Sequence, residues 1–296
     1  MRKILLATVA TFALASGALT SGALAGSDNV AYINQVGGSD NDAVQIQAGS
    51  GNDANAYQWG SQYYTATQGQ DGHRNEAASV QKGLGYRSSV TQTQAGDRNG
   101  ASATQNTARH SSITQKQTGD DNVAAASQSG DLFLATHNAI TQTQAGDANL
   151  ATATQAGSGR VTIGQTQSGN GNVASATQTG ASYNSTITQT QAGNGNKATG
   201  EQFFAVGSQI TQGQSGDRHE SIAYQGAVVG STITHTQSGY GNFADSSMTG
   251  QLGSIQLVVQ TGRNGDAIQR MGGLGSHNTQ TVHQSGNGNH ASQTQR

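Results

Sequence analysis

Ser185–Gln202 reads STITQTQAGNGNKATGEQ, and the same skeleton returns along most of the chain. Its constrained positions follow the pattern S-x5-Q-x-G-x2-N-x-A-x3-Q, in which Gln191 is the anchor. The pattern recurs every 23 or 24 residues, with one step of 27. Such a period is typical of stacked repeats, in which neighbouring coils together bury an inner face that one coil cannot bury alone. The other anchors are Gln47, Gln70, Gln94, Gln117, Gln144, Gln167, Gln214, Gln237, Gln260 and Gln284.

Each copy of the pattern predicts a strand, a turn and a second strand. Before the anchor, Ile187 and Gln189 alternate with Thr188 and Thr190, and this period of two with β-branched residues indicates a strand. After the anchor, x-Gly-x-x supplies the backbone freedom of a tight turn, and a second alternating segment with small residues follows. The turn glycines are Gly49, Gly72, Gly96, Gly119, Gly146, Gly169, Gly193, Gly216, Gly239, Gly262 and Gly286.

Stacking of such coils places Gln above Gln and Asn above Asn. At the strand spacing of about 4.8 Å, amide side chains hydrogen-bond along the stack as ladders. We therefore predict an all-β fold, a β-solenoid of about eleven strand-turn-strand repeats with two parallel in-register sheets and cross-β stacking. The ladder residues expected to drive self-assembly are Gln47, Asn52, Gln58, Gln94, Asn99, Gln105, Gln117, Asn122, Gln128, Gln144, Asn149, Gln155, Gln167, Asn172, Gln178, Gln191, Asn196, Gln202, Gln214, Gln225, Gln237, Asn242, Gln284, Asn289 and Gln295.

The composition agrees with a polar core filled by ladders. The chain is 32% hydrophobic and 10% charged, has no Pro and no Cys, and carries a net charge of -2. Low charge without Pro favours a cross-β ladder, since each Pro would remove a hydrogen bond from the stack. The near-neutral balance indicates neither nucleic acid nor anionic lipid as a partner. Residues 41–296 are assigned to one repeat domain, and residues 26–40 to a short N-terminal segment, either a partial half-coil or a recognition tail.

Residues 1–25 have the features of a secretory signal peptide. Arg2 and Lys3 precede an apolar run, and the segment ends in ALA at residues 23–25, so we expect cleavage between Ala25 and Gly26. A membrane anchor is the alternative, but the apolar run is short for a bilayer span. We therefore expect the mature chain to leave the cytoplasm by the Sec pathway.

No motif indicates catalysis or a bound cofactor. The sequence holds no nucleophile elbow or phosphate-binding loop, and its few Glu residues are dispersed. The eight His residues fall at different repeat positions and form no ligand pair, so we expect no metal site and no small-molecule substrate. Asp97, Asp120 and Asp147 share one position in consecutive coils. They are either a weak cation site, a like-charge brake on assembly, or solvated turn residues.

The pattern S-x5-Q-x-G-x2-N-x-A-x3-Q at this period resembles the curlin repeat, and most of the mature chain is similar to a curli subunit of a Gram-negative bacterium. The resemblance implies export through an outer-membrane secretion pore with a periplasmic chaperone. It also implies polymerisation, templated by a nucleator subunit, into a cell-surface amyloid fibre for biofilm matrix and cell adhesion. Because the last copy is intact at Gln284, Asn289 and Gln295, we expect the major subunit, with the minor nucleator as the alternative.

The chain also departs from the curlin pattern. It has more repeats, it carries Gln where an aliphatic residue is common two positions before the anchor, and it has no recognisable pore-directing segment. Two further alternatives are therefore kept. Outward Thr pairs such as Thr188 and Thr190 form an array typical of an ice-binding β-solenoid, which Lys116 and two Gly residues interrupt. A monomeric adhesin β-solenoid would need capped ends, and the last copy shows no cap.

Aromatic residues gather at the second corner of the coils. Such residues form either a sticky edge for lateral association or a filling of the turn. They are Trp59, Tyr63, Tyr64, Tyr86, Phe133, Tyr183, Phe203 and Phe204.

Overall fold

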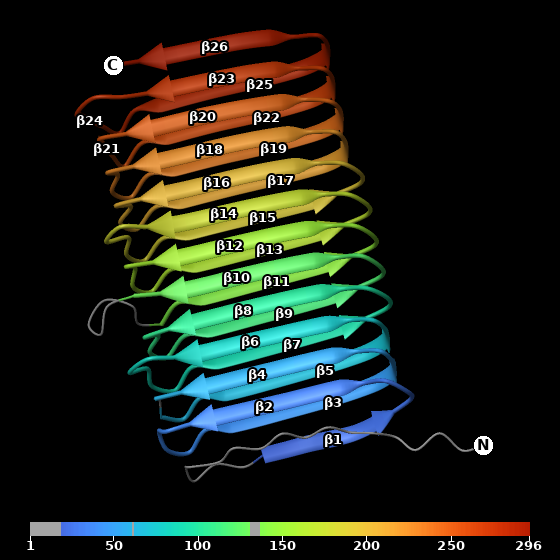
Figure 1. Cartoon of the computed structure of the whole chain (residues 1–296). Helices are drawn as coiled ribbons and strands as arrows, with labels where there is room; N and C mark the ends of the chain where they lie inside the picture. The colour runs from blue at the N-terminus through green and yellow to red at the C-terminus, as the bar shows by residue number, and fades with distance from the viewer. Residues whose placement is uncertain (1–18, 61, 131–136) are drawn as a thin grey trace. The chain divides into compact units, whose positions relative to one another are not determined.

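The computed structural model describes residues 19–60, 62–130 and 137–296, and the regular structure in them is all β. The chain divides into two compact units, Met1–Ala148 and Asn149–Arg296. Each unit is a β-solenoid of two parallel sheets, and together the units hold about eleven turns, so the predicted fold class is confirmed (Figure 1). The described residues include no helix long and apolar enough to span a membrane. Most of the predicted signal peptide, and Phe133 in the long corner, lie outside the described residues.

In each unit the first strands of the coils form one sheet, called the Thr sheet, and the second strands form the other, called the Ala sheet. The Thr sheet of the first unit has the order β1 (Leu19–Ala25), β3 (Asp42–Ser50), β5 (Thr65–His73), β7 (Ser89–Ala95), β9 (Ser112–Thr118) and β11 (Ala139–Ala145). The Ala sheet of this unit has the order β2 (Val30–Val36), β4 (Asp53–Trp59), β6 (Glu76–Lys82), β8 (Gly100–Asn106) and β10 (Val123–Ser129).

The second unit repeats this arrangement. Its Thr sheet has the order β13 (Thr162–Ser168), β15 (Thr186–Ala192), β17 (Gln209–Asp217), β19 (Thr232–Tyr240), β22 (Ile255–Arg263) and β25 (Thr279–Asn287). Its Ala sheet has the order β12 (Leu150–Ala156), β14 (Val173–Thr179), β16 (Lys197–Phe203), β18 (Glu220–Gly226), β20 (Phe243–Thr249), β23 (Asp266–Met271) and β26 (His290–Gln295). A short parallel pair, β21 (Gln251–Leu252) and β24 (Gly275–Ser276), lies at the second corner.

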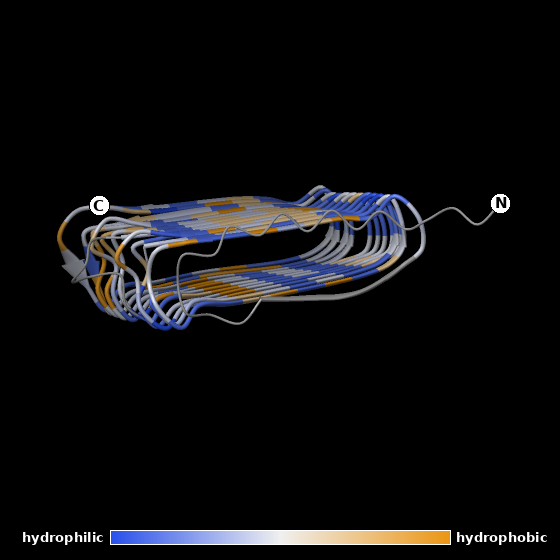
Figure 2. Cartoon of the chain, turned by 60° about the horizontal axis from the view of Figure 1, so that its bottom comes forward, coloured by the Kyte–Doolittle hydropathy of each residue, from blue (hydrophilic) through white to orange (hydrophobic). Residues whose placement is uncertain are grey.

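Burial alternates along the strands with the predicted period of two. In β15, Ile187, Gln189 and Gln191 are buried, whereas the Thr residues between them point outward. Within each unit the two sheets face one another, and the turns join them at both ends (Figure 2). A Cβ added to Gly200 of β16 would lie 2.9 Å from Ile187 Cγ2, so small residues of the Ala sheet pack directly on the aliphatic residues of the Thr sheet. The core is therefore thin, and amide side chains fill much of it.

The first turn of the coil depends on its glycine. Gly193 has a φ of 111°, a conformation that side chains disfavour. A Cβ at this position would also lie 2.1 Å from the carbonyl oxygen of Gly216 in the next coil. Both constraints recur at Gly49, Gly72, Gly96, Gly119, Gly169, Gly216, Gly239 and Gly262, because the turns of successive coils within a unit lie directly above one another.

The repeat begins before residue 41. Residues 26–40 contribute β2, which pairs in register with β4. Gln35 Nε2 donates a hydrogen bond of 2.6 Å to Gln58 Oε1, and the backbone N–H of Asn52 donates to Asn29 Oδ1 at 3.0 Å. Asn29 and Gln35 therefore occupy ladder positions, although this coil has no anchor Gln. Its first strand is β1, which pairs with β3 with an irregular register between Ser21 and Leu24.

Candidate functional site

The anchor Gln residues form a hydrogen-bonded column in each unit, with Nε2 of one coil donating to Oε1 of the next. Neighbouring amides are 2.7–2.9 Å apart in the first unit and 2.8–3.0 Å apart in the second. The first column contains Gln47, Gln70, Gln94, Gln117 and Gln144. The second contains Gln167, Gln191, Gln214, Gln237, Gln260 and Gln284.

Each anchor amide also joins the two sheets. Gln191 Nε2 donates to Gln214 Oε1 at 2.9 Å along the stack and to the backbone oxygen of Val173 at 3.0 Å across it. Both amide hydrogens are thus used, which allows a polar side chain to be buried without cost for an unpaired donor. A Gln at this position therefore fixes the register of the coils and the separation of the sheets at the same time.

Two further Gln columns run parallel to the anchor column. The closing column links Gln35, Gln58, Gln81, Gln105 and Gln128 in the first unit, and Gln155, Gln178, Gln202 and Gln225 in the second. The inner column, two positions before the anchor, links Gln45, Gln68, Gln92, Gln115 and Gln142 in the first unit, and Gln165, Gln189 and Gln212 in the second. The inner column was absent from the predicted ladder residues, although the recurring Gln at this position was its signal.

The Asn column holds the first turn. The backbone N–H of Asn196 donates to Asn172 Oδ1 at 3.0 Å, and Asn196 Nδ2 donates to the carbonyl oxygen of Gly216 at 2.7 Å. The same pair of bonds recurs at Asn52, Asn99, Asn122 and Asn172. The backbone hydrogen bonds of the sheet stop where the chain turns. There the Asn side chain accepts from one backbone N–H group and donates to a backbone carbonyl oxygen.

The predicted ladder residues occupy inward positions, and 23 of the 25 are buried. The two exceptions are Asn289 and Gln295, which lie in the last coil and are half-buried. Asn289 Nδ2 donates to Ser285 O at 2.7 Å, and Gln295 Nε2 donates to Asn278 Oδ1 at 2.9 Å. These two amides are partly exposed because no further coil covers them.

Two buried histidines interrupt the ladders of the second unit. His235 replaces the inner Gln, and its ring nitrogens lie 2.8 Å from Ser221 Oγ and 2.7 Å from Ser246 Oγ. Burial lowers the pKa of His235 to about 3, since the charged imidazolium would lose its hydration. His219 replaces the column Asn, accepts from the backbone N–H of Asn242 at 3.2 Å, and also has a pKa lowered by burial.

The three aspartates at the first turn lie above one another. The backbone N–H of Asp97 donates to Asp120 Oδ1 at 2.9 Å, and that of Asp120 donates to Asp147 Oδ1 at 2.9 Å. Beside them, Arg98 forms a two-pronged ion pair with Asp121, with both contacts at 2.7 Å, and this pairing lowers the pKa of Asp121. The described residues contain no group of three or more His, Asp or Glu arranged to hold a metal ion. The stack therefore brings like charges together, and backbone donors partly compensate for them.

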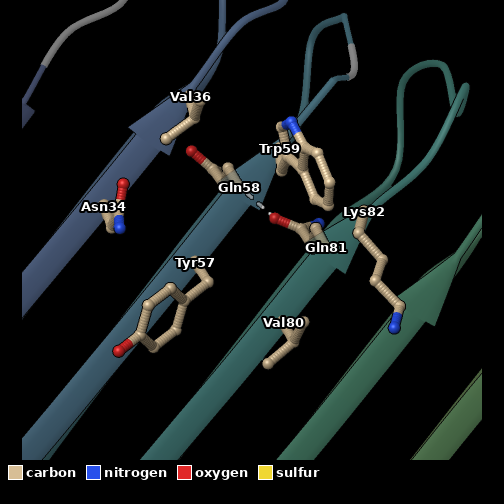
Figure 3. Close-up of a pocket in the computed structure, with 8 residues that line it drawn as sticks. All are labelled: Asn34, Val36, Tyr57, Gln58, Trp59, Val80, Gln81 and Lys82. Carbon is tan, nitrogen blue, oxygen red and sulfur yellow. Dashed lines mark hydrogen bonds between the residues drawn. The ribbon is translucent and has the colours of Figure 1, made fainter. Parts of the chain in front are cut away.

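The aromatic residues of the second corner divide into buried and exposed groups. Tyr64 is fully buried, and burial raises its pKa to about 12. Trp59 is 64% exposed and Tyr57 is 43% exposed. They line a shallow apolar groove on the outer face of the Ala sheet, with Val36, Val80 and Lys82 from neighbouring strands (Figure 3). Tyr64 thus fills the turn, whereas Trp59 belongs to a surface.

The two ends of the ladder differ in the hydrogen-bonding groups that they present. Among the described residues, Gln45 Oε1 and Gln47 Oε1 are buried without a hydrogen-bond donor. In the last coil, Gln284 Oε1 accepts from Gln260, and Gln284 Nε2 donates to Asp266 O at 2.8 Å. One Nε2 hydrogen of Gln284 has no acceptor within the described chain. The column of the first unit therefore lacks a donor at Gln47, and the column of the second unit lacks an acceptor at Gln284.

No protein-family model matches the chain, and no curated protein matches it significantly.

Proposed function

We propose that the mature chain is the structural subunit of an extracellular curli-type amyloid fibre, built by end-to-end self-assembly for biofilm matrix and cell adhesion. The observation that carries the proposal is the complementarity of the two ladder ends. Gln47 Oε1 lacks a donor and Gln284 Nε2 has a hydrogen to donate. A second copy of the chain supplies the missing group at each end, at the strand spacing of about 4.8 Å that the ladder already uses.

The junction between two copies has a defined register. Stacking of β25 and β26 of one copy on β3 and β4 of the next pairs Gln284 with Gln47 and Gln295 with Gln58. Cleavage after Ala25 removes β1, so β3 becomes the outermost strand of its sheet. In this register β2 must leave β4, and residues 26–40 then become a tail at each junction. An exposed sheet edge of this kind is a template for pairing with another chain.

The remaining parts of the proposal follow from the resemblance to curlins. The chain is exported by the Sec pathway and an outer-membrane pore, with a periplasmic chaperone and a nucleator subunit as partners. We favour the major subunit because the last coil keeps Gln284, Asn289 and Gln295 in place. A minor nucleator would be expected to start fibres without being incorporated along their whole length.

The test is seeded growth of residues 26–296 after removal of denaturant, followed by thioflavin T fluorescence and electron microscopy. Triple substitution of Gln284, Asn289 and Gln295 by Ala is expected to slow elongation at least tenfold. The matched control replaces three exposed residues of the same coil, Thr281, Ser285 and Thr294, by Ala and is expected to elongate normally. Equal elongation rates for the two variants would rule out the ladder junction, and a soluble monomer that never seeds would rule out the fibre.

One observation favours a second function, ice binding by a monomeric solenoid. The central outward column of the Thr sheet holds runs of Thr in successive coils, so hydroxyl and methyl groups repeat at the strand spacing, although Val44, Gly164 and Leu257 also stand in this column. Its members in register are Thr67, Thr91, Thr114 and Thr141 in the first unit, and Thr188, Thr211 and Thr234 in the second. Thermal hysteresis in a solution free of fibres would support this function over the fibre.

A further inference from the structure

The second corner of the second unit carries a third set of parallel backbone pairs. Tyr183, Val206, Val229 and Leu252 follow one another as isolated parallel bridges. The N–H of Val206 donates to Val228 O at 2.9 Å, and the N–H of Gly207 donates to Tyr183 O at 2.8 Å. These four residues, called the corner stripe, therefore repeat at the coil spacing of about 4.8 Å.

The side chains of the corner stripe point outward. Tyr183 is 41% exposed, Val206 38%, Val229 46% and Leu252 49%. The residues immediately before them, including Ala205, Val228 and Gln251, are buried. The four coils that hold these residues thus turn one apolar side chain out at the same place, between Gly159 and Ser276 in the coils on either side, and Figure 2 shows apolar residues among those of this corner. Contiguous exposed apolar side chains of this kind mark interaction surfaces.

The rim of the corner stripe favours close approach by a partner. The residues that follow the stripe are Asn184, Gly207, Gly230 and Gly253, with φ between 50° and 61°. None of the four carries a charge, and three have no side chain to hold a partner away. On the other side, Phe203 and Phe204 are 43% and 47% exposed and extend the apolar surface. A charged group lies at one end of the stripe, where the Arg160 guanidinium is 5.8 Å from the centre of the Tyr183 ring.

The fold itself does not require apolar residues at these positions. The same bridges in the first unit are formed by Ser39, Gln62, Tyr86 and Arg109, three of which are polar or charged. The corner therefore closes equally well with polar side chains. The apolar character of the corner stripe is a property of the surface rather than of the turn.

We propose that the corner stripe is the lateral contact between fibres, seated against the same stripe of a second copy of this chain. The side chains of the stripe project at intervals of about 4.8 Å. A second surface packs into every gap between them only if its own side chains have the same spacing, as in the dry interfaces between paired sheets. A helix presents one apolar row every 5.4 Å or so and falls out of step along four rows. A symmetric contact between two identical stripes matches every row.

The corner stripe contributes only a few residues of each chain to this contact. Four residues per chain are far fewer than the roughly 20–30 residues that each side of a stable interface contributes. Two single chains are therefore not held together by it. End-to-end stacking repeats the stripe along a fibre, and many weak contacts then act together. The inference thus rests on the proposed fibre and adds a separate surface for the bundling of fibres.

The test compares fibre growth with fibre bundling for residues 26–296. Val206→Thr with Val229→Thr keeps the side-chain shape and adds a hydroxyl, so folding and seeded growth should stay within twofold of the unaltered chain. The fraction of fibres lying in bundles by electron microscopy is expected to fall severalfold. The control, Val123→Thr with Val173→Thr, changes two valines on the outer face of the Ala sheet, outside the stripe. A gain variant, Gln62→Val, places an exposed apolar side chain beside Tyr86 at the same bridge position of the first unit and should increase bundling.

The outcomes separate the two proposals. Fibres whose bundling is the same in the stripe variant and the unaltered chain would overturn the lateral contact alone. The same conclusion would follow if the control variant lost bundling to the same extent, or if the unaltered fibres never bundled. An unaltered chain that forms no fibres would overturn both the fibre and its lateral contact.

Discussion

Acidification should destabilise the fold through His235, the buried residue that replaces a ladder Gln. Its ring lies between Ser221 Oγ and Ser246 Oγ, and no charged group contributes to the change in its pKa. The pKa falls from 6.5 to about 3 on folding. Between about pH 3 and pH 6.5, the unfolded chain therefore binds a proton at His235 that the folded chain does not bind. The contribution of neutral His235 to the free energy of unfolding is fully present above pH 6.5 and is lost progressively as the pH falls from 6.5 to about 3.

The size of the effect at pH 5 depends mainly on the unfolded state. Each pH unit below the unfolded pKa costs about 1.36 kcal/mol while the folded ring stays neutral, so the loss at pH 5 is about 2 kcal/mol. The folded ring, with a pKa of about 3, is neutral at pH 5, so the protonation of the unfolded chain sets the loss. An equilibrium constant should change by a factor of about 30.

The assay is guanidinium unfolding at pH 7 and pH 5, with the free energy of unfolding compared between the unaltered chain and His235→Gln. The variant restores the Gln of the inner column, in register with Gln212 of the neighbouring strand, and should lose about 2 kcal/mol less between the two pH values. The carboxylates and His219 contribute equally to the pH dependence of both chains, so their contribution cancels in the comparison. His283→Gln, at an exposed position of β25, is the matched control and should behave as the unaltered chain. Equal losses in His235→Gln and the unaltered chain would refute the reasoning.

Three other substitutions test the ladder, the turn and the charge stack. Gln191→Ala leaves buried partners in Gln167 and Gln214 and should cost about 2–5 kcal/mol of unfolding free energy, whereas Thr190→Ala on the outer face should cost under about 0.5. Gly193→Ala meets both a φ of 111° and the Gly216 oxygen, so a loss of more than about 3 kcal/mol is expected in the same titration. Gly164→Ala, where an added Cβ has nothing within 4 Å, should be tolerated. Asp120→Asn keeps the acceptor oxygen and removes the central charge, which should stabilise the folded chain by about 0.5–1 kcal/mol, and an unchanged midpoint would contradict like-charge repulsion.

Deletion of residues 26–40 tests the junction register. If β2 leaves β4 when copies stack, seeds of residues 41–296 should elongate at least as fast as seeds of residues 26–296. Elongation that stops without this segment would show that β2 is part of the junction. The rate of seeded thioflavin T growth measures the difference.

The period-two pattern of the strands does not extend to the aromatic residues of the second corner. Alternation predicts which side chains of a strand point inward, but it stops where the chain turns, so Tyr63 and Tyr64 could not be separated by sequence. Tyr64 is buried and its hydroxyl donates to Ala108 O at 3.5 Å, whereas Tyr63 is 44% exposed. The difference arises because neighbouring coils cover one of two adjacent residues.

The repeat by itself determined the fold class, the two strands of each coil, the turn glycines and the inward amides. It could do so because in-register stacking turns one local pattern into every long-range contact, so the period predicts which residues meet. Only the tertiary structure decided how each amide divides its hydrogen bonds, that β2 joins the stack without an anchor Gln, and that apolar corner residues align in the second unit alone. These features depend on the distance between sheets and on the path of the corners, which three-dimensional packing sets and a period of two does not specify.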